Sequence, residues 1–184
     1  MKRLPLSIIL LAFMFSTAPA QNWPQFRGPG ATGVTEGLPK PVKWDVSNQT
    51  NVRWKTPIPG LSHSSPVVWG NKVFVMTAVS SGADEKRFGL YGDVKPVKED
   101  PKHAYKVYAV DKQKGTILWE RVAWEGIPKI KRHPKSTHAA ATPVTDGKYL
   151  IALFGSEGLY AYDLNGKLLW KQDLGVLDAG WFYD

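Results

Sequence analysis

The chain has 184 residues, a formal net charge of +8 and no cysteine, which excludes disulfides, thiol catalysis and thiolate metal sites within it. Its 17 glycines and 14 prolines fall every few residues and argue against long helices, while 8 tryptophans are many for this length. The basic residues are scattered apart from KIKRHPK at 129–135, which we interpret as a solvated loop, so we expect no nucleic-acid partner.

Residues 1–20 have the pattern of a secretory signal peptide. Lys2 and Arg3 precede an unbroken apolar run at 8–15, and Ala18-Pro19-Ala20 fits the small-x-small rule for cleavage. The run is shorter than the roughly 20 apolar residues that a membrane span needs, so we expect no membrane-spanning helix. Without a cysteine after it, we expect no lipoprotein. The sequence thus predicts a secreted or periplasmic protein, cleaved near Ala20.

Residues 21–50 are rich in glycine and proline and show little periodicity. We interpret them as an extended N-terminal arm, pinned by the large side chains of Trp23, Phe26 and Trp44.

From residue 51 onward, short strand patterns alternate with turn signals. Residues 51–57 (NVRWKTP) predict a single outer strand that belongs to neither of the two rounds below. Two rounds of four strands follow, the first at 62–122 with a loop insertion at 80–104, and the second at 138–173. Because the strands within a round are joined mostly by tight turns, each round predicts one antiparallel four-stranded sheet. Residues 174–184 would begin a third round.

The two rounds are copies of one repeat. YAVDKQKGTILWE at 108–120 returns about fifty residues later as YAYDLNGKLLWK at 160–171. Both alternating faces of KVYAVD are apolar, so the sheet should be covered on both sides. Small four-stranded sheets that stack face to face around an axis make a β-propeller, and an all-β propeller with about two complete blades is the predicted fold.

The repeated dozen residues predict how one blade docks on the next. Asp111 should cap the turn that ends the third strand, and Gly115 should reach a positive φ there. The indole of Trp119 should lie flat over the next blade, where only a small residue such as alanine or glycine leaves room, with its N–H on a carbonyl.

AVDKQKGTILW places Ala, Gly and Trp at its first, seventh and eleventh positions, and AYDLNGKLLW is one residue shorter in the turn. This pattern resembles the tryptophan-docking motif of pyrroloquinoline-quinone (PQQ)-like propeller repeats. That family includes the quinoprotein alcohol dehydrogenases and the lipoprotein that helps assemble outer-membrane β-barrels. NWPQFRGPGATGV at 22–34 is also similar to the mature start of many exported bacterial PQQ-like repeat proteins.

The resemblance implies seven or eight blades, so we expect the chain to be an N-terminal fragment of a longer protein. The strand at 51–57, with Trp54, would complete the last blade and close the ring.

Two histidines are the candidate site residues. His63 and His138 each come shortly before the first strand of their round, so both are expected at one rim of the channel, where they could bind a metal or ligand. Neighbouring hydroxyls could equally pair with them in a purely structural loop. Arg87, Phe88, Tyr91 and His103 in the insertion are candidates for partner binding. Asp111 and Asp163 occupy equivalent places in different blades, which favours turn capping over a catalytic pair.

Two functions remain open. The first is a binding or scaffold module for an unknown protein or polymer, without catalysis, metal or cofactor in this segment. The second is a periplasmic PQQ-dependent dehydrogenase whose site lies in other blades. The resemblance implies that such enzymes hold PQQ on the axis against adjacent cysteines and a tryptophan, with calcium on Glu, Asn and Asp. No catalytic residue of that set can be matched here, so the sequence favours the first function.

Overall fold

The computed structural model describes residues 21–35, 41–82 and 101–177. Over these ranges no helix has the length and apolarity to cross a bilayer. The signal peptide predicted at 1–20, most of the predicted insertion, and the chain from residue 178 onward lie outside the described residues. Those assignments therefore stay predictions.

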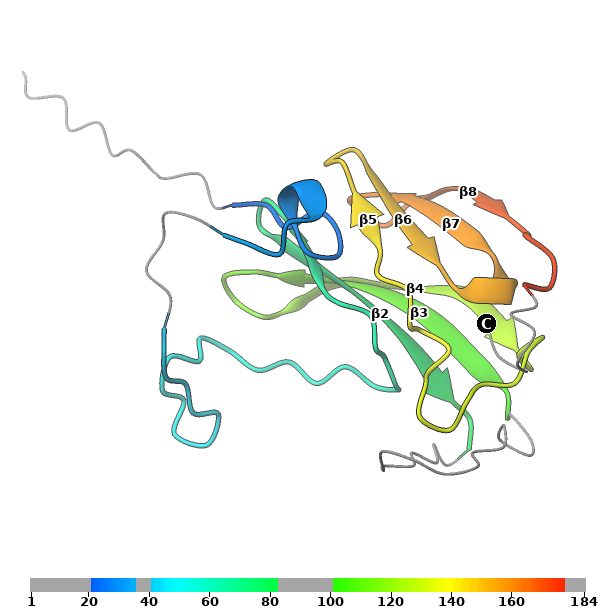
Figure 1. Ribbon diagram of the computed structural model, residues 1–184, viewed down its shortest axis with the longest axis horizontal. Helices are drawn as coiled ribbons and strands as arrows, with labels where there is room; N and C mark the ends of the chain where they lie inside the picture. Colours follow the sequence, from blue (N-terminus) through cyan, green and yellow to red (C-terminus); the bar gives the residue numbers. More distant parts are fainter. Residues whose placement is uncertain (1–20, 36–40, 83–100, 178–184) are drawn as a thin grey trace, which may run out of the picture.

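Two antiparallel four-stranded sheets make up the body of the described structure (Figure 1). In each sheet the strands follow one another in chain order, as predicted for propeller blades, and the sheets do not close a ring. This confirms the all-β fold with four-stranded blades. The first sheet contains β1 (Val67–Trp69), β2 (Lys72–Ser80), β3 (His103–Asp111) and β4 (Ile117–Gly126). The second contains β5 (Val144–Thr145), β6 (Tyr149–Leu153), β7 (Leu159–Asp163) and β8 (Leu168–Gln172).

Two short 3-10 helices complete the regular structure of the described residues: η1 (Pro29–Ala31) in the N-terminal arm and η2 (Gly155–Glu157) between β6 and β7. The strand β3 already begins at His103, so this residue, assigned above to the insertion, belongs to the sheet.

The core lies between the two sheets. Phe74, Met76 and Val107 of the first sheet are fully buried, and Leu150, Ala152 and Tyr162 of the second belong to the same apolar cluster. Each large apolar side chain buried in this way contributes about 1.5–3 kcal/mol to stability. Burial also raises the pKa of Tyr162 to about 12. The other face of β3 is covered too, as the pattern of KVYAVD predicted, because Tyr108 and Val110 are equally inaccessible.

A tryptophan of the first sheet docks on a glycine of the second. A Cβ added at Gly166, whose φ is 82°, would lie 2.7 Å from Cδ2 of Trp119, so the indole rests directly on the glycine backbone. Trp119 Nε1 donates a hydrogen bond to the carbonyl of Leu164 at 3.1 Å. The predicted docking contact is therefore confirmed.

The same contact occurs once more, before the first sheet. The ring of Trp54 covers Gly115, which has a φ of 74°, and its Nε1 donates to the carbonyl of Lys112 at 2.9 Å. On the second sheet, Trp170 pairs with Ala161 as Trp119 pairs with Ala109. Trp170 is 47% exposed, whereas Trp119 is 9% exposed, because the described residues include no third sheet.

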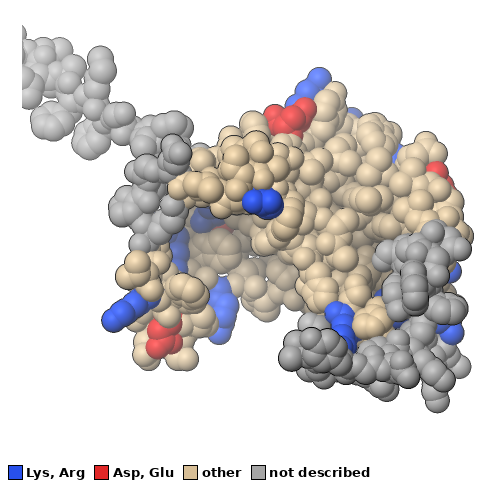
Figure 2. Space-filling model, viewed as in Figure 1, with Lys and Arg blue, Asp and Glu red and all other residues tan. Residues whose placement is uncertain are grey.

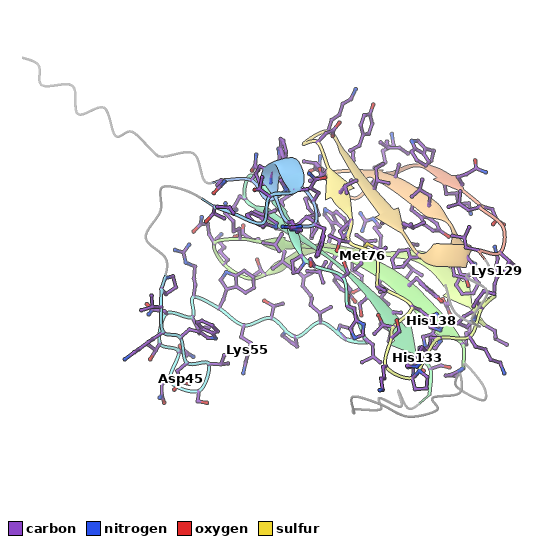
Figure 3. The ribbon with its side chains drawn as sticks, viewed as in Figure 1. Asp45, Lys55, Met76, Lys129, His133 and His138 are labelled. Carbon is purple, nitrogen blue, oxygen red and sulfur yellow. The ribbon has the colours of Figure 1, made fainter. Side chains whose placement is uncertain are left out.

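Residues 51–57 differ from their prediction as an outer strand. They contain no strand in the structure, although Trp54 docks as expected and Thr56 Oγ1 bonds the carbonyl of Gly115. A strand is defined by its ladder of hydrogen bonds to a neighbour, and within the described residues no neighbouring strand lies beside this segment. In Figure 3, Lys55 marks this segment and Asp45 marks the turn before it, both apart from the two sheets.

We predict that Gly166→Ala destabilises the protein more than Gly70→Ala. Both substitutions place a side chain at positive φ, which costs about 1–2 kcal/mol. Only the Cβ at position 166 meets the indole of Trp119, whereas the Cβ at position 70 has nothing within 4 Å. The clash with the indole should therefore lower the free energy of unfolding of Gly166→Ala by about 1–3 kcal/mol more than that of Gly70→Ala, measured by urea unfolding. Equal losses for the two variants would contradict this account of docking.

Candidate functional site

The candidate site lies at one end of the two sheets, here called the rim. At the rim β2 ends, β3 begins, and β6 passes through η2 into β7. The connector between the sheets, residues 127–143, also crosses this end, and Figure 3 shows its residues His133 and His138 there. Because the docked tryptophan fixes the two sheets against each other, side chains from both meet at the rim.

A concave site of about 540 Å³, here called the rim hollow, opens between these elements. Its walls are mostly apolar and aromatic, with four side chains that carry polar groups: Tyr105, Thr137, His138 and Glu157. The lining residues are Tyr105 of β3, then Thr137, His138, Ala140 and Ala141 of the connector, Leu153, Phe154, Gly155 and Glu157, and finally Val176 and Leu177.

Aromatic rings form the base of the rim hollow. Tyr105 and Phe154 are almost fully buried, and their rings meet edge to face with centroids 5.3 Å apart. Tyr105 continues the alternation of β3 that also buries Val107 and Ala109, so the strand pattern places it on the face toward the second sheet. Phe154 in turn packs on Tyr160 at 6.2 Å. The floor is therefore closely packed and mostly apolar.

Charged groups hold the connector against η2. The carboxylate of Glu157, which is buried, accepts a hydrogen bond from the backbone N–H of Lys129 at 2.7 Å. The ammonium of Lys129 donates to the carbonyl of Ser156 at 2.8 Å and to Asp173 at 2.9 Å. The hydrogen bond from Lys129 holds the pKa of Asp173 below its usual range. Lys129, the first residue of the basic run at 129–135, is thus used to fix one side of the rim hollow.

His138 lines the rim hollow and stacks on other rings. It is half-buried, and its ring meets that of His103 edge to face at 4.9 Å and that of Tyr105 at 5.8 Å. His103 is itself buried, and its Nδ1 lies 2.6 Å from the carbonyl of Pro101, so this nitrogen carries the proton that the carbonyl accepts.

His63 lies at the same rim as His138, but its side chain is exposed. The two segments run side by side, since the backbone N–H groups of His63 and Ser64 both donate to the carbonyl of Ala139, at 3.1 and 3.0 Å. His63 is not among the described residues that line the rim hollow. Within the described part of the chain, no group of three or more His, Asp or Glu side chains could hold a metal. A ligand-binding role of the two histidines stays a prediction.

Sequence reasoning did not single out Tyr105, Phe154 or Glu157. These residues come from separate segments and have no motif spacing, so only their position at the rim brings them together. The one available signal was the alternation of β3, which marks Tyr105 as a core residue but not as the wall of a site. Of the insertion residues named as candidates, Arg87, Phe88 and Tyr91 lie outside the described residues.

The arrangement of sheets and docked tryptophans agrees with a comparison of the sequence with known families. The sequence model described as "Outer membrane protein assembly factor BamB" matches residues 32–178. The chain belongs to this PQQ-like repeat family. A search of curated proteins found no significant match. Membership explains the repeated Trp-on-Gly contact and does not by itself assign a ligand.

PQQ, which some members of the PQQ-like repeat family hold, can be tested against the residues present. The resemblance implies adjacent cysteines and a calcium site of Glu, Asn and Asp. The chain has no cysteine, and the described residues contain no cluster that could hold a metal. The described residues therefore do not fit PQQ, and no chemical step through it follows from them.

The two turn aspartates act as caps in both repeats. Asp111 Oδ1 accepts hydrogen bonds from the backbone N–H groups of Gln113 and Lys114, each at 2.8 Å. Asp163 Oδ1 accepts from Asn165 and Lys167 at 2.8 and 2.9 Å. These backbone donors, with Lys114 and Lys167 as the largest contributors, hold the pKa of both carboxyls below the usual range.

We predict that the stabilising contribution of these two caps is lost in acid. A carboxyl with a lowered pKa in the folded state stabilises the fold above its unfolded pKa of about 3.9 and loses that contribution as pH falls through the folded pKa. The urea midpoint of the wild type should therefore drop between pH 5 and pH 3. In Asp111→Asn/Asp163→Asn the turns keep a carbonyl acceptor that does not titrate, so the drop should be smaller. An unchanged drop would refute the assignment.

Proposed function

We propose that this chain is an exported binding module and that the rim hollow receives an apolar side chain of a partner polypeptide. The observation that carries the proposal is the rim hollow itself, which combines a buried aromatic floor with a few polar groups. Sites that bind ligands are concave, mostly apolar and about 300–1,000 Å³ in volume, and the rim hollow has this character. Export rests on the predicted signal peptide at residues 1–20.

The mouth of the rim hollow suggests how a partner would enter. Val176 and Leu177 are 58% and 37% exposed, although both are apolar, and they stand beside the buried Phe154. An apolar side chain that enters between them would cover this exposed surface. On the coloured part of the face shown in Figure 2, Lys and Arg side chains lie singly among uncharged residues.

The family description supports a polypeptide as the partner. It names an assembly factor for outer membrane proteins, and we extend this role to the present chain as a proposal. Transmembrane β-strands alternate apolar and polar residues over about ten positions, so before folding they offer single apolar side chains at regular intervals. A hollow that accepts one such side chain suits this class of partner.

We predict that Val176→Asp weakens binding of an extended apolar peptide about tenfold, equivalent to about 1.4 kcal/mol. The probe is a fluorescein-labelled peptide of about ten residues in which Phe and Tyr alternate with Ser and Thr, as in barrel strands. Fluorescence polarisation would measure its affinity. The charge at position 176 would have to be desolvated in the rim hollow, which is unfavourable.

Val46→Asp is the matched control for that measurement. Val46 is also an exposed valine, at 50%, but it lies in the turn near Asp45 and not at the rim hollow. Its substitution should leave the affinity within about twofold of wild type. Equal affinity for the two variants, or no binding by the wild type, would contradict the proposal.

The alternative function is a periplasmic PQQ-dependent dehydrogenase whose site lies in other blades. It is favoured by the docking motif, which resembles that of the quinoprotein alcohol dehydrogenases. For this alternative, PQQ and calcium added to the protein should give a quinone absorbance band and dye-linked alcohol oxidation. The binding module predicts neither.

A further inference from the structure

The N-terminal arm continues the first sheet on its inner side. Trp23 and Val68 exchange two backbone hydrogen bonds, N–H to carbonyl in each direction, both at 2.8 Å. Strand β1 is the first strand of its sheet and pairs with β2 through its other edge. The arm therefore occupies the edge of β1 that faces away from the rest of the blade.

The next residue of the arm reaches the second sheet. The carbonyl of Pro24 accepts a hydrogen bond from the backbone N–H of Thr145 in β5 at 2.9 Å. On the other side of Trp23, Asn22 Oδ1 accepts from the N–H of Gly70 at 2.8 Å. Asn22, Trp23 and Pro24 thus bind the β1–β2 turn, β1 and β5 in succession. Figure 1 shows the arm and its helix η1, in blue, beside β5.

The arm is locked in this shape by a small version of the docking contact between blades. A Cβ added at Gly28, whose φ is 69°, would lie 2.6 Å from the Trp23 ring. The carbonyl of Gln25 accepts a hydrogen bond from the backbone N–H of Gly28 at 2.9 Å, and the Gln25 side-chain amide donates one to the carbonyl of Gly28 at 3.2 Å. Arg27 is held at a φ of 62°, a left-handed conformation that non-glycine residues seldom adopt. Such a strained loop persists only when its surroundings determine it.

We propose that this arm, residues 22–33, is a built-in plug on the axis of the propeller. The innermost strands of the blades line the central channel of a propeller, and β1 and β5 are those strands here. The hydrogen bonds of the arm lie near the β1–β2 turn, at the opposite end of the sheets from the rim. The axial position at that end is therefore filled by backbone of this chain, and a ligand would have to displace it.

The plug and the proposed rim site are independent of each other. They involve different residues at opposite ends of the sheets, so either can fail without the other. The plug also bears on PQQ, which the resemblance places on the axis, because the inner strands of these two blades already have a partner at this end.

Amide hydrogen exchange on the full chain tests the plug with two alanine variants. Gly28 and Gly30 both have positive φ, 69° and 60°, but a Cβ at Gly30 would come no closer than 3.6 Å to any atom. Gly28→Ala should push the indole of Trp23 away and release the arm. The amides of Val68 and Thr145 should then exchange at least about tenfold faster, while Gly30→Ala should change them less than about threefold. The amide of Met76 in the core should stay protected in both variants.

Two results would overturn the plug. One is unchanged exchange at Val68 and Thr145 in Gly28→Ala, which would mean that the arm does not protect the inner strands. The other is an equal acceleration at these amides in Gly28→Ala and Gly30→Ala, which would mean that the contact of Trp23 with Gly28 does not hold the arm on the inner strands.

Discussion

A flat indole on a glycine turn is the contact on which the rest of this structure depends. Trp119 covers Gly166 and donates its N–H to a carbonyl in the same turn, so both the spacing and the rotation of the two sheets are set at one point. Any side chain at position 166 would force the indole or the turn to shift, because its Cβ would lie inside the van der Waals contact distance of the ring. The same contact between Trp54 and Gly115 shows that it is the rule of this repeat.

The fixed spacing of the sheets creates the rim hollow. Once Trp119 is docked, Tyr105 of the first sheet meets Phe154 of the second edge to face, and the connector must cross over both. Lys129 and Glu157 then tie the connector to η2 through hydrogen bonds. The hollow is thus a consequence of blade packing, and the side chains that line it do not determine the fold.

The two ends of the blades are used differently. At one end the N-terminal arm pairs with the inner strands β1 and β5. Within the arm, the ring of Trp23 packs on Gly28 as the ring of Trp119 packs on Gly166. At the other end apolar side chains such as Val176 remain open to solvent. A partner that binds at the rim would therefore contact side chains. At the other end, the arm already pairs with backbone groups of β1 and β5.

The sequence alone determined the repeat, the four strands of each blade and the docking residues, because these depend on local alternation, on glycine at positive φ and on the spacing of Ala, Gly and Trp. The capping role of Asp111 and Asp163 followed from the same local chemistry. Only the tertiary structure decided which side chains form the rim hollow and that the arm pairs with β1 and β5. Contacts such as Tyr105 with Phe154, or Pro24 with Thr145, join distant segments, and no local pattern encodes them. For the same reason 51–57 lacks the predicted strand: its hydrogen-bond ladder needs a neighbour that local sequence cannot supply.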